Sequence, residues 1–273
     1  MPSKEWLEKY EAVKEKLRCK KDLDAYFTEK EIGGTPIDTL DIGSVSFPTG
    51  EVVVCDPLVE FAGARPYIQT IPSGRYPVTI CVVPSEKYGD RYACVKVAVS
   101  GEKPVRYELG LCGDEEFDEL EEDEFFGFCV DAGMGCVADA KTQEAFKKYW
   151  EQRESEEEGI DYYNDLFCDL LEENAKVLPK YQREGGDWLN WTVPGTKLNF
   201  PIFASAGATA YIPSTSATTR TARSAALHPL HRRGRRIQRK RRNRINLTAV
   251  STRKKTARSQ PTASGCLCRW VYP

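Results

Sequence analysis

The stretch that decides the fold is residues 125–140, FFGFCVDAGMGCVADA. It begins as an apolar run rich in aromatic and β-type residues, which predicts a buried strand. The run breaks at the glycine-containing sequence DAGMG and ends on Asp139, directly before a helical pattern. We therefore expect a strand, a glycine turn and a helix start, in that order. Two carboxylates, Asp131 and Asp139, flank the turn, so this stretch is the first candidate for a functional site.

Short strand candidates fill much of the chain before this stretch. Turn sequences such as PTG and PSG separate some of them. The candidate strands are residues 37–42, 51–55, 76–83, 92–99 and 105–111. Several short strands joined by polar loops predict an antiparallel sheet or sandwich and disfavour a parallel βαβ fold. An amphipathic helix is expected near the N-terminus, where Trp6, Tyr10 and Val13 recur at helical spacing.

Two helices are expected after the central strand. Asp139 can cap the first of them, which continues to about residue 154. The second covers residues 162–178 and stops before a proline. Residues 188–203 then return to strand character. The predicted fold class is therefore α+β, with an antiparallel sheet or sandwich, an N-terminal helix and two helices after the central strand.

Charge divides the chain into parts of different character. All 41 Asp and Glu residues lie at or before position 187, whereas residues 205–273 hold 16 of the 39 Lys and Arg residues. Residues 1–204 therefore keep 23 basic residues against 41 acids, a net charge of −18. We expect an N-terminal helical segment at residues 1–34, a single α+β domain at residues 35–204 and a disordered basic tail at residues 205–273.

Two explanations compete for the basic tail. Runs such as HRRGRRIQRKRRNR (231–244) commonly mark nuclear localisation or nucleic-acid contact. A change of reading frame explains the tail better, because Glu codons read out of frame encode Arg and Lys. Permitted codons for residues 206–226, shifted by one base, yield Gly-Trp-Gly-Asp-Gly and then an acidic sequence with strand alternation and a hairpin turn. We therefore predict a frameshift after about Ser205, which truncates the domain at its C-terminal strands.

Four segments carry a resemblance to a known family. They are PIDTLDIGSVSFPTGEVVVCDPLV (36–59), PSGRYPVTICVV (72–83), RYACVKVAVS (91–100) and FGFCVDAGMGCVADA (126–140). Over roughly residues 36–204 the chain resembles the family catalogued as domain of unknown function 4241, and the frame-corrected glycine-rich segment is similar to that family's C-terminal signature. The positions that match the family's pattern are Asp56, Pro57, Gly74, Arg91, Asp131, Gly133 and Asp139. The resemblance implies a soluble, mostly bacterial domain and supplies no established activity.

The first functional hypothesis is a non-catalytic binding or interaction module. Residues 1–204 contain no His, which excludes a His-based triad from that part of the chain. Phosphate-binding Gly-Lys-Ser/Thr loops and dinucleotide fingerprints are also missing from the sequence, so we expect neither a cofactor nor a metal. The net charge of −18 on residues 1–204 disfavours nucleic acid and favours either a basic protein partner or simple solubility. The sequence shows no membrane-length apolar run and no signal peptide, which predicts a cytoplasmic location.

The alternative hypothesis is a carboxylate-dependent hydrolase that could use a divalent metal ion. Asp56, Asp131 and Asp139 would divide the acid and base roles or hold the ion through their oxygens. Each carboxylate also has a structural interpretation. Asp56 precedes a proline as a turn residue, Asp139 caps a helix, and Asp131 can accept hydrogen bonds from the amides of the glycine turn.

The candidate binding residues are Arg75, Arg91, Gly74 and Gly133. Either arginine could clamp an anionic group beside the carboxylates. The glycines stand in turns, where the lack of a side chain allows close approach to the backbone.

Ten cysteines are present, mostly single within apolar stretches and without the paired spacing of a zinc site. This pattern predicts reduced, buried thiols in a cytosolic protein. A third functional hypothesis makes Cys129 or Cys136 a nucleophile, although residues 1–204 offer neither of them a histidine partner.

Overall fold

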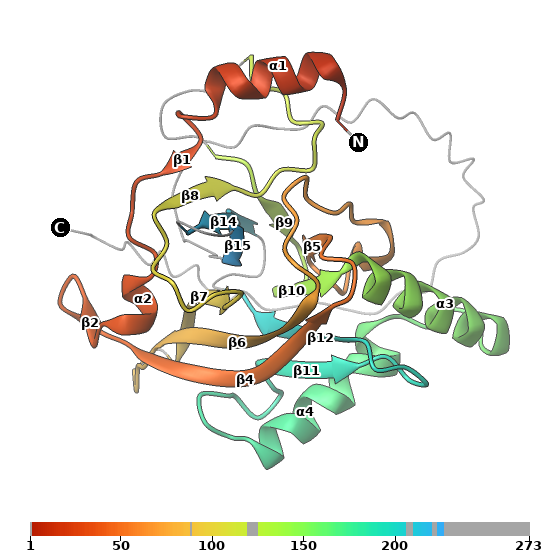
Figure 1. The fold of residues 1–273 in the computed structure, drawn as a ribbon. Coiled ribbons are helices and arrows are strands. Elements are labelled where there is room, and N and C mark those ends of the chain that lie inside the picture. The colour runs from red at the N-terminus through yellow and green to blue at the C-terminus, as the bar shows by residue number, and fades with distance from the viewer. Residues whose placement is uncertain (1, 88, 119–124, 206–209, 220–222, 227–273) are drawn as a thin grey trace, which may run out of the picture. The chain divides into compact units, whose positions relative to one another are not determined.

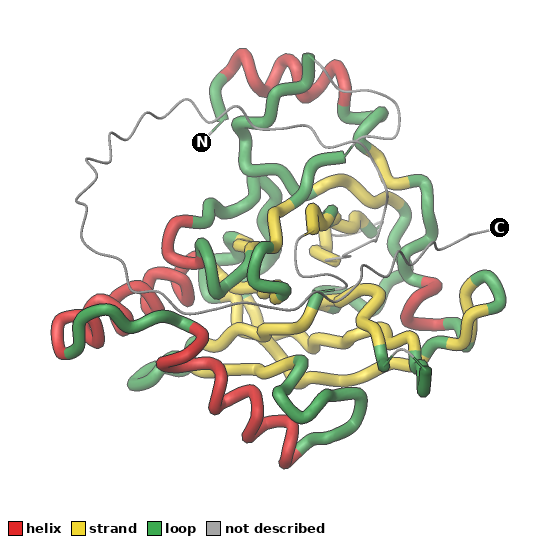
Figure 2. The backbone as a smooth tube through the Cα atoms, turned by 180° about the vertical axis from the view of Figure 1, so that it is seen from behind, coloured by secondary structure: helices red, strands yellow, loops and turns green. Residues whose placement is uncertain are grey.

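The computed structural model describes residues 2–87, 89–118, 125–205, 210–219 and 223–226 (Figure 1). The chain separates after residue 236 into two units, and every described residue belongs to the first. Helices and antiparallel sheets make up this described part, which confirms the predicted α+β class. Figure 2 shows the same strands and helices from behind.

Two antiparallel sheets share the main core. The first has the order β4-β6-β7 and consists of β4 (Asp38–Phe47), β6 (Gly74–Val83) and β7 (Arg91–Val97). The second has the order β11-β12-β10-β5 and consists of β11 (Trp188–Thr192), β12 (Asn199–Ala204), β10 (Met134–Asp139) and β5 (Val52–Cys55). Side chains from both sheets form one buried cluster that includes Val45, Val54, Ile80, Val95 and Val137. Removing this apolar surface from water favours the pairing of the sheets.

Two asparagines tie β4 to the second sheet. Asn190 Nδ2 donates to the Ile42 carbonyl at 2.9 Å, and Asn199 Nδ2 donates to the Ser44 carbonyl at 2.6 Å. These carbonyls lie where the pairing of β4 with β6 is interrupted by a bulge. Gly43 sits in the bulge at φ +90°, where a β-carbon would come within 3.1 Å of Asn190 Nδ2. The asparagines therefore satisfy backbone groups that the bulge leaves without a strand partner.

Helices pack on the other face of the second sheet. They are α3 (Ala140–Glu156), α4 (Cys168–Val177), the 3₁₀ turn η1 (Phe61–Gly63) and the π-helical turn η2 (Tyr163–Phe167). Their buried side chains join those of the sheet in a second core cluster. Phe61, Phe146, Phe167, Trp191 and Phe200 form its aromatic centre, with ring centroids 4.5–6.2 Å apart. Most of these pairs are tilted or edge-on and Phe146–Phe167 is stacked, arrangements that add to the stability gained from burial.

The remaining strands form smaller sheets. The sheet of order β1-β8-β14-β15 consists of β1 (Arg18–Cys19), β8 (Arg106–Leu109), β14 (Thr215–Thr218) and β15 (Arg223–Ala226). Two further pairs are β9 (Phe128–Val130) with β13 (Ala210–Ile212), and β2 (Glu31–Ile32) with β3 (Thr35–Pro36). The N-terminal segment contributes α1 (Lys4–Val13) and α2 (Ala25–Thr28). The predicted N-terminal helix is confirmed, with its start capped by the Ser3 hydroxyl.

Residues 125–140 contain two strands where the sequence predicts one. β9 pairs with β13, whereas β10 pairs with β5 and β12. Gly133 adopts φ +83°, which allows the chain to turn between the two strands. All six residues of β10 are buried, and a strand buried on both faces shows no alternation that would predict it. The predicted helix start is confirmed, because α3 begins at Ala140.

The disordered tail predicted from residue 205 needs correction over its first part. β13, β14 and β15 lie at residues 210–226, and β14 pairs with β8 in the interior of its sheet. Ser214, Thr215 and Ala217 are buried. Small side chains without alternation can occupy such a strand, because the ladder is built from backbone groups. The prediction for residues 227–273 lies outside the described residues.

Candidate functional site

Asp139 is fully buried and holds together two turns of the backbone. Its Oδ2 accepts hydrogen bonds from the Thr49 amide at 2.9 Å, the Thr49 hydroxyl at 2.8 Å and the Gly50 amide at 2.9 Å. Its Oδ1 accepts from the Lys141 amide at 2.8 Å and so caps α3. Both carboxylate oxygens are thus engaged by backbone donors.

Asp56 is buried in the same manner at the end of β5. Its Oδ2 accepts from the amides of Asp131 at 3.0 Å and Ala132 at 2.7 Å, and its Oδ1 accepts from the Leu58 amide at 3.1 Å. Burial raises the pKa of the Asp56 carboxyl above its usual value, and the three amides oppose this shift. The side chain of Asp56 therefore fixes the 131–133 turn.

Asp131 itself is exposed and accepts a weak hydrogen bond from Cys129 Sγ at 3.7 Å. Its amide meets Asp56, so these two residues are neighbours at one end of β10. Asp139 lies at the other end, because it pairs with Val52 across the β5–β10 ladder. Asp56 follows Val52 by four residues along the chain, which separates Asp56 from Asp139 by roughly 13 Å. Among the described residues no group of three or more His, Cys, Asp and Glu side chains could hold a metal ion.

Arg75 and Gly74 lie at the start of β6, opposite the end of β4. Arg75 Nε donates to the Ser44 hydroxyl at 2.6 Å, and Arg75 Nη1 donates to the Ser46 hydroxyl at 3.4 Å. The guanidinium is thus already engaged across the β4–β6 pair. A β-carbon at Gly74 would come within 2.6 Å of the Tyr76 hydroxyl. Glycine at this position therefore leaves space for the Tyr76 side chain, which belongs to the same strand.

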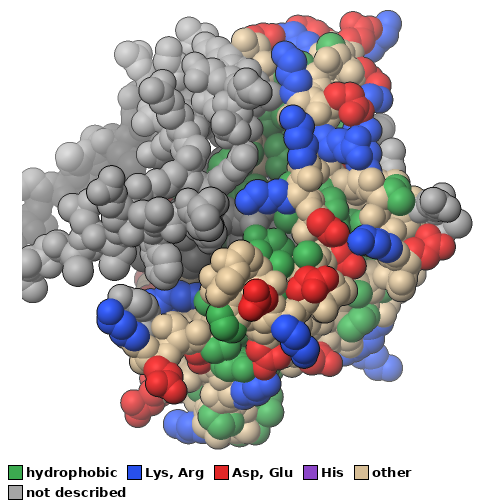
Figure 3. Space-filling view, turned by 90° about the vertical axis from the view of Figure 1, so that its left-hand side faces the viewer, with side chains coloured by type: hydrophobic (Ala, Val, Ile, Leu, Met, Phe, Trp, Pro, Cys, Tyr) green, Lys and Arg blue, Asp and Glu red, His purple; other side chains and the backbone are tan. Residues whose placement is uncertain are grey.

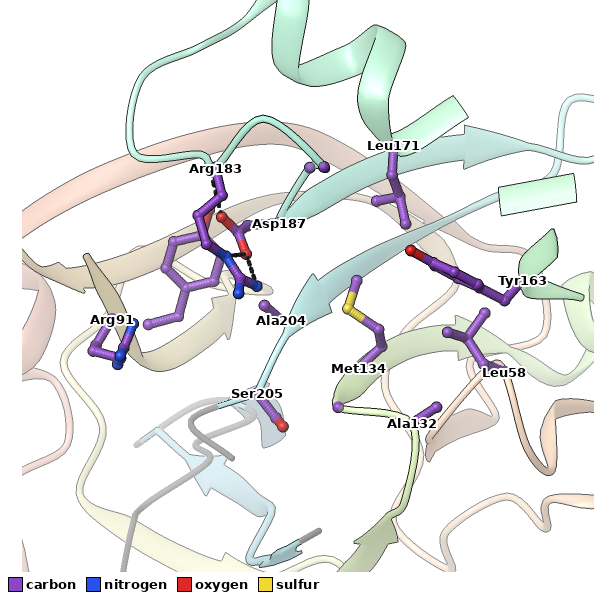
Figure 4. A pocket seen from close by; sticks show the side chains of 14 residues that line it. Leu58, Arg91, Ala132, Met134, Tyr163, Leu171, Arg183, Asp187, Ala204 and Ser205 are labelled. Atoms are coloured by element: carbon purple, nitrogen blue, oxygen red, sulfur yellow. Dashed lines mark hydrogen bonds and ion pairs between the residues drawn. The ribbon is translucent and has the colours of Figure 1, made fainter. Parts of the chain in front are cut away.

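Arg91 and Gly133, the other two candidate binding residues, line a common pocket of about 390 Å³. Figure 4 shows the two sides of the pocket, one with Arg91, Arg183 and Asp187 and the other with Met134 and Tyr163. The volume lies within the range of small-ligand sites. Arg91 Nη1 donates to the Asp90 carbonyl at 3.2 Å, and within the described part of the chain Arg91 forms no ion pair.

The polar side of this pocket contains a hydrogen-bonded pair, Arg183 and Asp187, that we did not predict from the sequence. Arg183 Nε donates to Asp187 Oδ1 at 2.8 Å, and the Arg183 amide donates to Asp187 Oδ2 at 2.6 Å. The hydrogen bond to Asp187 raises the pKa of the Arg183 guanidinium above its usual value. The sequence REGGDW (183–188) offers one signal, since two glycines beside paired charges favour a tight loop with an ordered backbone.

The two candidate nucleophilic cysteines occupy different environments. Cys136 is buried, and its Sγ lies 3.7 Å from the Sγ of Cys55 on the neighbouring strand. Burial raises the pKa of the Cys55 thiol well above its usual value, which disfavours the thiolate. Cys129 is partly exposed and donates a weak hydrogen bond to the Asp131 carboxylate. Burial of Cys136 removes the access to solvent that a cysteine nucleophile needs.

Within the described residues, none of the helices combines the length and apolar character needed to cross a membrane.

No curated protein and no solved structure matches the chain. The family model described as Protein of unknown function (DUF4241) matches residues 45–211, which include the end of β4, all of β6 and β7, the Asp56 and Asp139 turns and the Arg91 pocket. With more than half of its length matched, the chain belongs to the DUF4241 family of proteins of unknown function.

Proposed function

We propose that this domain is a non-catalytic binding module that engages a basic protein partner. The observation that carries the proposal is the engagement of Asp56 and Asp139. Both carboxylates are buried and accept hydrogen bonds from backbone amides, so they serve as structural caps. The hydrolase alternative needs them to converge with Asp131, and the β5–β10 register keeps Asp56 and Asp139 apart.

The acidic residues at the C-terminal end of α3 support a basic partner. Glu154, Glu156, Glu157 and Glu158 are exposed there, and within the described residues none forms an ion pair. The end of a helix carries partial negative charge from its free carbonyl groups, so carboxylates at this position are electrostatically unfavourable. A basic surface docked against them would relieve that repulsion. The net charge of −18 on residues 1–204 would also attract such a partner over a longer range.

A peptide-binding experiment with matched variants tests this proposal. The test variant changes the four glutamates at the end of α3 to Gln, and the control changes four other exposed glutamates, Glu29, Glu31, Glu51 and Glu184, to Gln. Both variants lose the same charge, so fluorescence anisotropy with a labelled polylysine peptide separates local from overall attraction. We expect the test variant to bind about tenfold more weakly than the control. Equal affinities of the two variants would contradict a docking site at α3.

A thermal-shift experiment addresses the hydrolase alternative in the same protein. Mg²⁺ or Mn²⁺ bound to the folded state would raise the midpoint of unfolding by mass action. The binding-module proposal predicts a change of less than about 1 °C at millimolar metal concentrations. A larger rise that disappears in Asp131→Asn would favour the hydrolase.

A small anionic ligand in the Arg91 pocket is a second candidate, favoured by the absence of an ion pair at Arg91 in the described part of the chain. The guanidinium would bind a carboxylate while Met134 and Tyr163 contact an apolar body. Arg91→Gln should then abolish binding of a carboxylate fragment found by NMR screening, and Arg75→Gln is the matched control. A fragment that binds equally well to both variants would exclude this pocket.

We further propose that the module works in the cytoplasm of a bacterial cell. Six described cysteines, Cys19, Cys55, Cys81, Cys94, Cys136 and Cys168, are free thiols, and Cys55 and Cys136 form an adjacent pair. Free thiols in such proximity are typical of a reducing compartment.

A further inference from the structure

A second cavity, of about 440 Å³, lies between the N-terminal segment and the strand β8. Its walls are residues 15–22 and residues 103–107, which β1 and β8 bring together by pairing Arg18 with Glu108 and Cys19 with Tyr107. Five cationic side chains line it, Arg18, Lys20, Lys21, Lys103 and Arg106. Figure 3 shows Lys and Arg side chains grouped on the left-hand face of Figure 1, where β1 lies.

The cavity carries an excess of positive charge in a domain that is otherwise acidic. Two of its lining residues are acids, and each is already paired. Asp22 lies 3.3 Å from Lys103 Nζ, and Glu15 lies 2.7 Å from Arg106 Nη1. Arg18, Lys20 and Lys21 form no ion pair with any of the described residues. Three uncompensated cations therefore border one concave surface, although residues 1–204 have a net charge of −18.

Arg106 is held in position at the base of this group. Its Nη1 bonds to Glu15 and its Nε lies 2.7 Å from Glu108 Oε1. Its Nη2 is buried and, like Nε, has no hydrogen-bond partner of good geometry among the described residues. The two glutamates fix the direction of the guanidinium in advance.

We propose that this cavity binds a small polyanion carrying phosphate groups. The three uncompensated cations lie within four residues of one wall, and the paired Lys103 and Arg106 face them from the other, so the surplus charge is compact and suits a small polyanion better than an extended acidic peptide. Lys ammonium groups suit phosphate as point charges, and a fixed Arg suits it through directed hydrogen bonds. The volume falls within the range of small-ligand sites. The binding site is distinct from the Arg91 pocket, with which it shares no lining residue.

The site depends on a part of the chain that the family model leaves out. Residues 15–22 precede the matched region, whereas residues 103–107 lie inside it. All lining residues precede Ser205, but the wall at residues 103–107 is supported by β14, which pairs Thr218 with Arg106 and Ala217 with Tyr107. The region that matches the family model supplies only the wall at residues 103–107. Ligand binding in this cavity would therefore also need the N-terminal segment, which supplies the other wall.

Calorimetric titration of the full chain with inorganic tripolyphosphate tests the proposal. The test variant is Lys20→Gln with Lys21→Gln, and the matched control is Lys141→Gln with Lys197→Gln. All four lysines are exposed and none has an ion-pair partner in the described part of the chain, so the two variants lose equal charge and should fold alike. We expect the test variant to bind about tenfold more weakly than the wild type, and the control to stay within about twofold.

Three outcomes would overturn the proposal. The first is no measurable binding of tripolyphosphate to the wild type at low salt. The second is an equal loss of affinity in the test and control variants, which would show that only overall charge matters. The third is tighter binding of a glutamate hexapeptide than of tripolyphosphate, which would replace the phosphate-bearing ligand by an acidic peptide. As a second variant, Arg18→Gln alone should weaken binding in the same direction, and unchanged affinity there would count against the site.

Discussion

The Asp139 carboxylate accepts two hydrogen bonds from Thr49, one from its amide at 2.9 Å and one from its hydroxyl at 2.8 Å. This contact joins the turn before β5 to the start of α3, two parts of the chain 90 residues apart. The same carboxylate is the N-cap of α3. Its burial and its full set of donors identify Asp139 as a structural residue of the domain.

Asp139→Ala should destabilise the domain by about 2–4 kcal/mol. The substitution removes a helix cap worth about 1 kcal/mol and leaves the buried amide of Gly50 unsatisfied at about 1–3 kcal/mol. Urea unfolding measures the change. The exposed Asp131→Ala should alter the free energy of unfolding by about 0.5 kcal/mol or less. A loss of similar size in both variants would contradict the structural role of Asp139.

Asp56 should make stability depend on pH in an unusual direction. Burial raises its pKa in the folded state above the ordinary value of about 3.9 that holds in the unfolded chain. The folded protein therefore takes up the proton at higher pH, so the contribution of Asp56 to stability is greatest below about pH 3.9 and is lost as the pH rises through the raised pKa.

In the Asp56→Asn variant the side chain at position 56 no longer titrates. Comparison of this variant with the wild type therefore isolates the effect of Asp56 ionisation on stability. The difference in free energy of unfolding, wild type minus Asp56→Asn, should fall as the pH rises from about 4 to about 7. Urea unfolding at several pH values measures it. A difference that rises over the same interval would mean that the amides of Leu58, Asp131 and Ala132 outweigh burial and hold the pKa below its ordinary value.

Four cysteines should resist alkylation in the native protein. Cys55, Cys81, Cys94 and Cys136 are each 1% exposed or less, and burial raises the pKa of the Cys55 and Cys94 thiols. Alkylation needs the thiolate and access to reagent, so these residues should react only through opening of the fold. Mass spectrometry after iodoacetamide treatment measures the rates. The partly exposed Cys112 and Cys129 are internal controls and should react much faster.

We propose that the gene changes reading frame near codon 205, and two measurements bear on this. Independent sequencing across codons 200–230 should show a one-base slip, and an uninterrupted frame would end the idea. A frame-corrected protein should also be more stable than the present chain, because its final strands regain alternation and acidic residues. Equal midpoints of thermal unfolding for the two proteins would contradict the second expectation.

Local patterns account for the elements that the sequence predicts correctly. Asp139 before a helical pattern identifies the start of α3, and the proline at position 179 marks the end of α4. Both are short-range effects of side-chain and backbone chemistry. The cap role of Asp139 and the turn role of Asp56 were among the structural interpretations that the sequence already allowed.

Partners distant in sequence could not be predicted in this way. Thr49 as the partner of Asp139, Arg183 beside Arg91, and the pairing of β1 with β8 all depend on how sheets stack and in which register. The strands at residues 210–226 also escaped prediction, since backbone hydrogen bonds stabilise them without an alternating sequence.

The sequence alone thus determined the α+β class, the family and the charge contrast along the chain, because periodicity, capping residues and composition act locally. Only the tertiary structure decided that Asp56 and Asp139 are caps at opposite ends of one strand pair, and that five cations share a cavity beside β8. The physical reason is that a hydrogen-bond ladder sets the distance between residues far apart in the chain, and no local pattern contains that register.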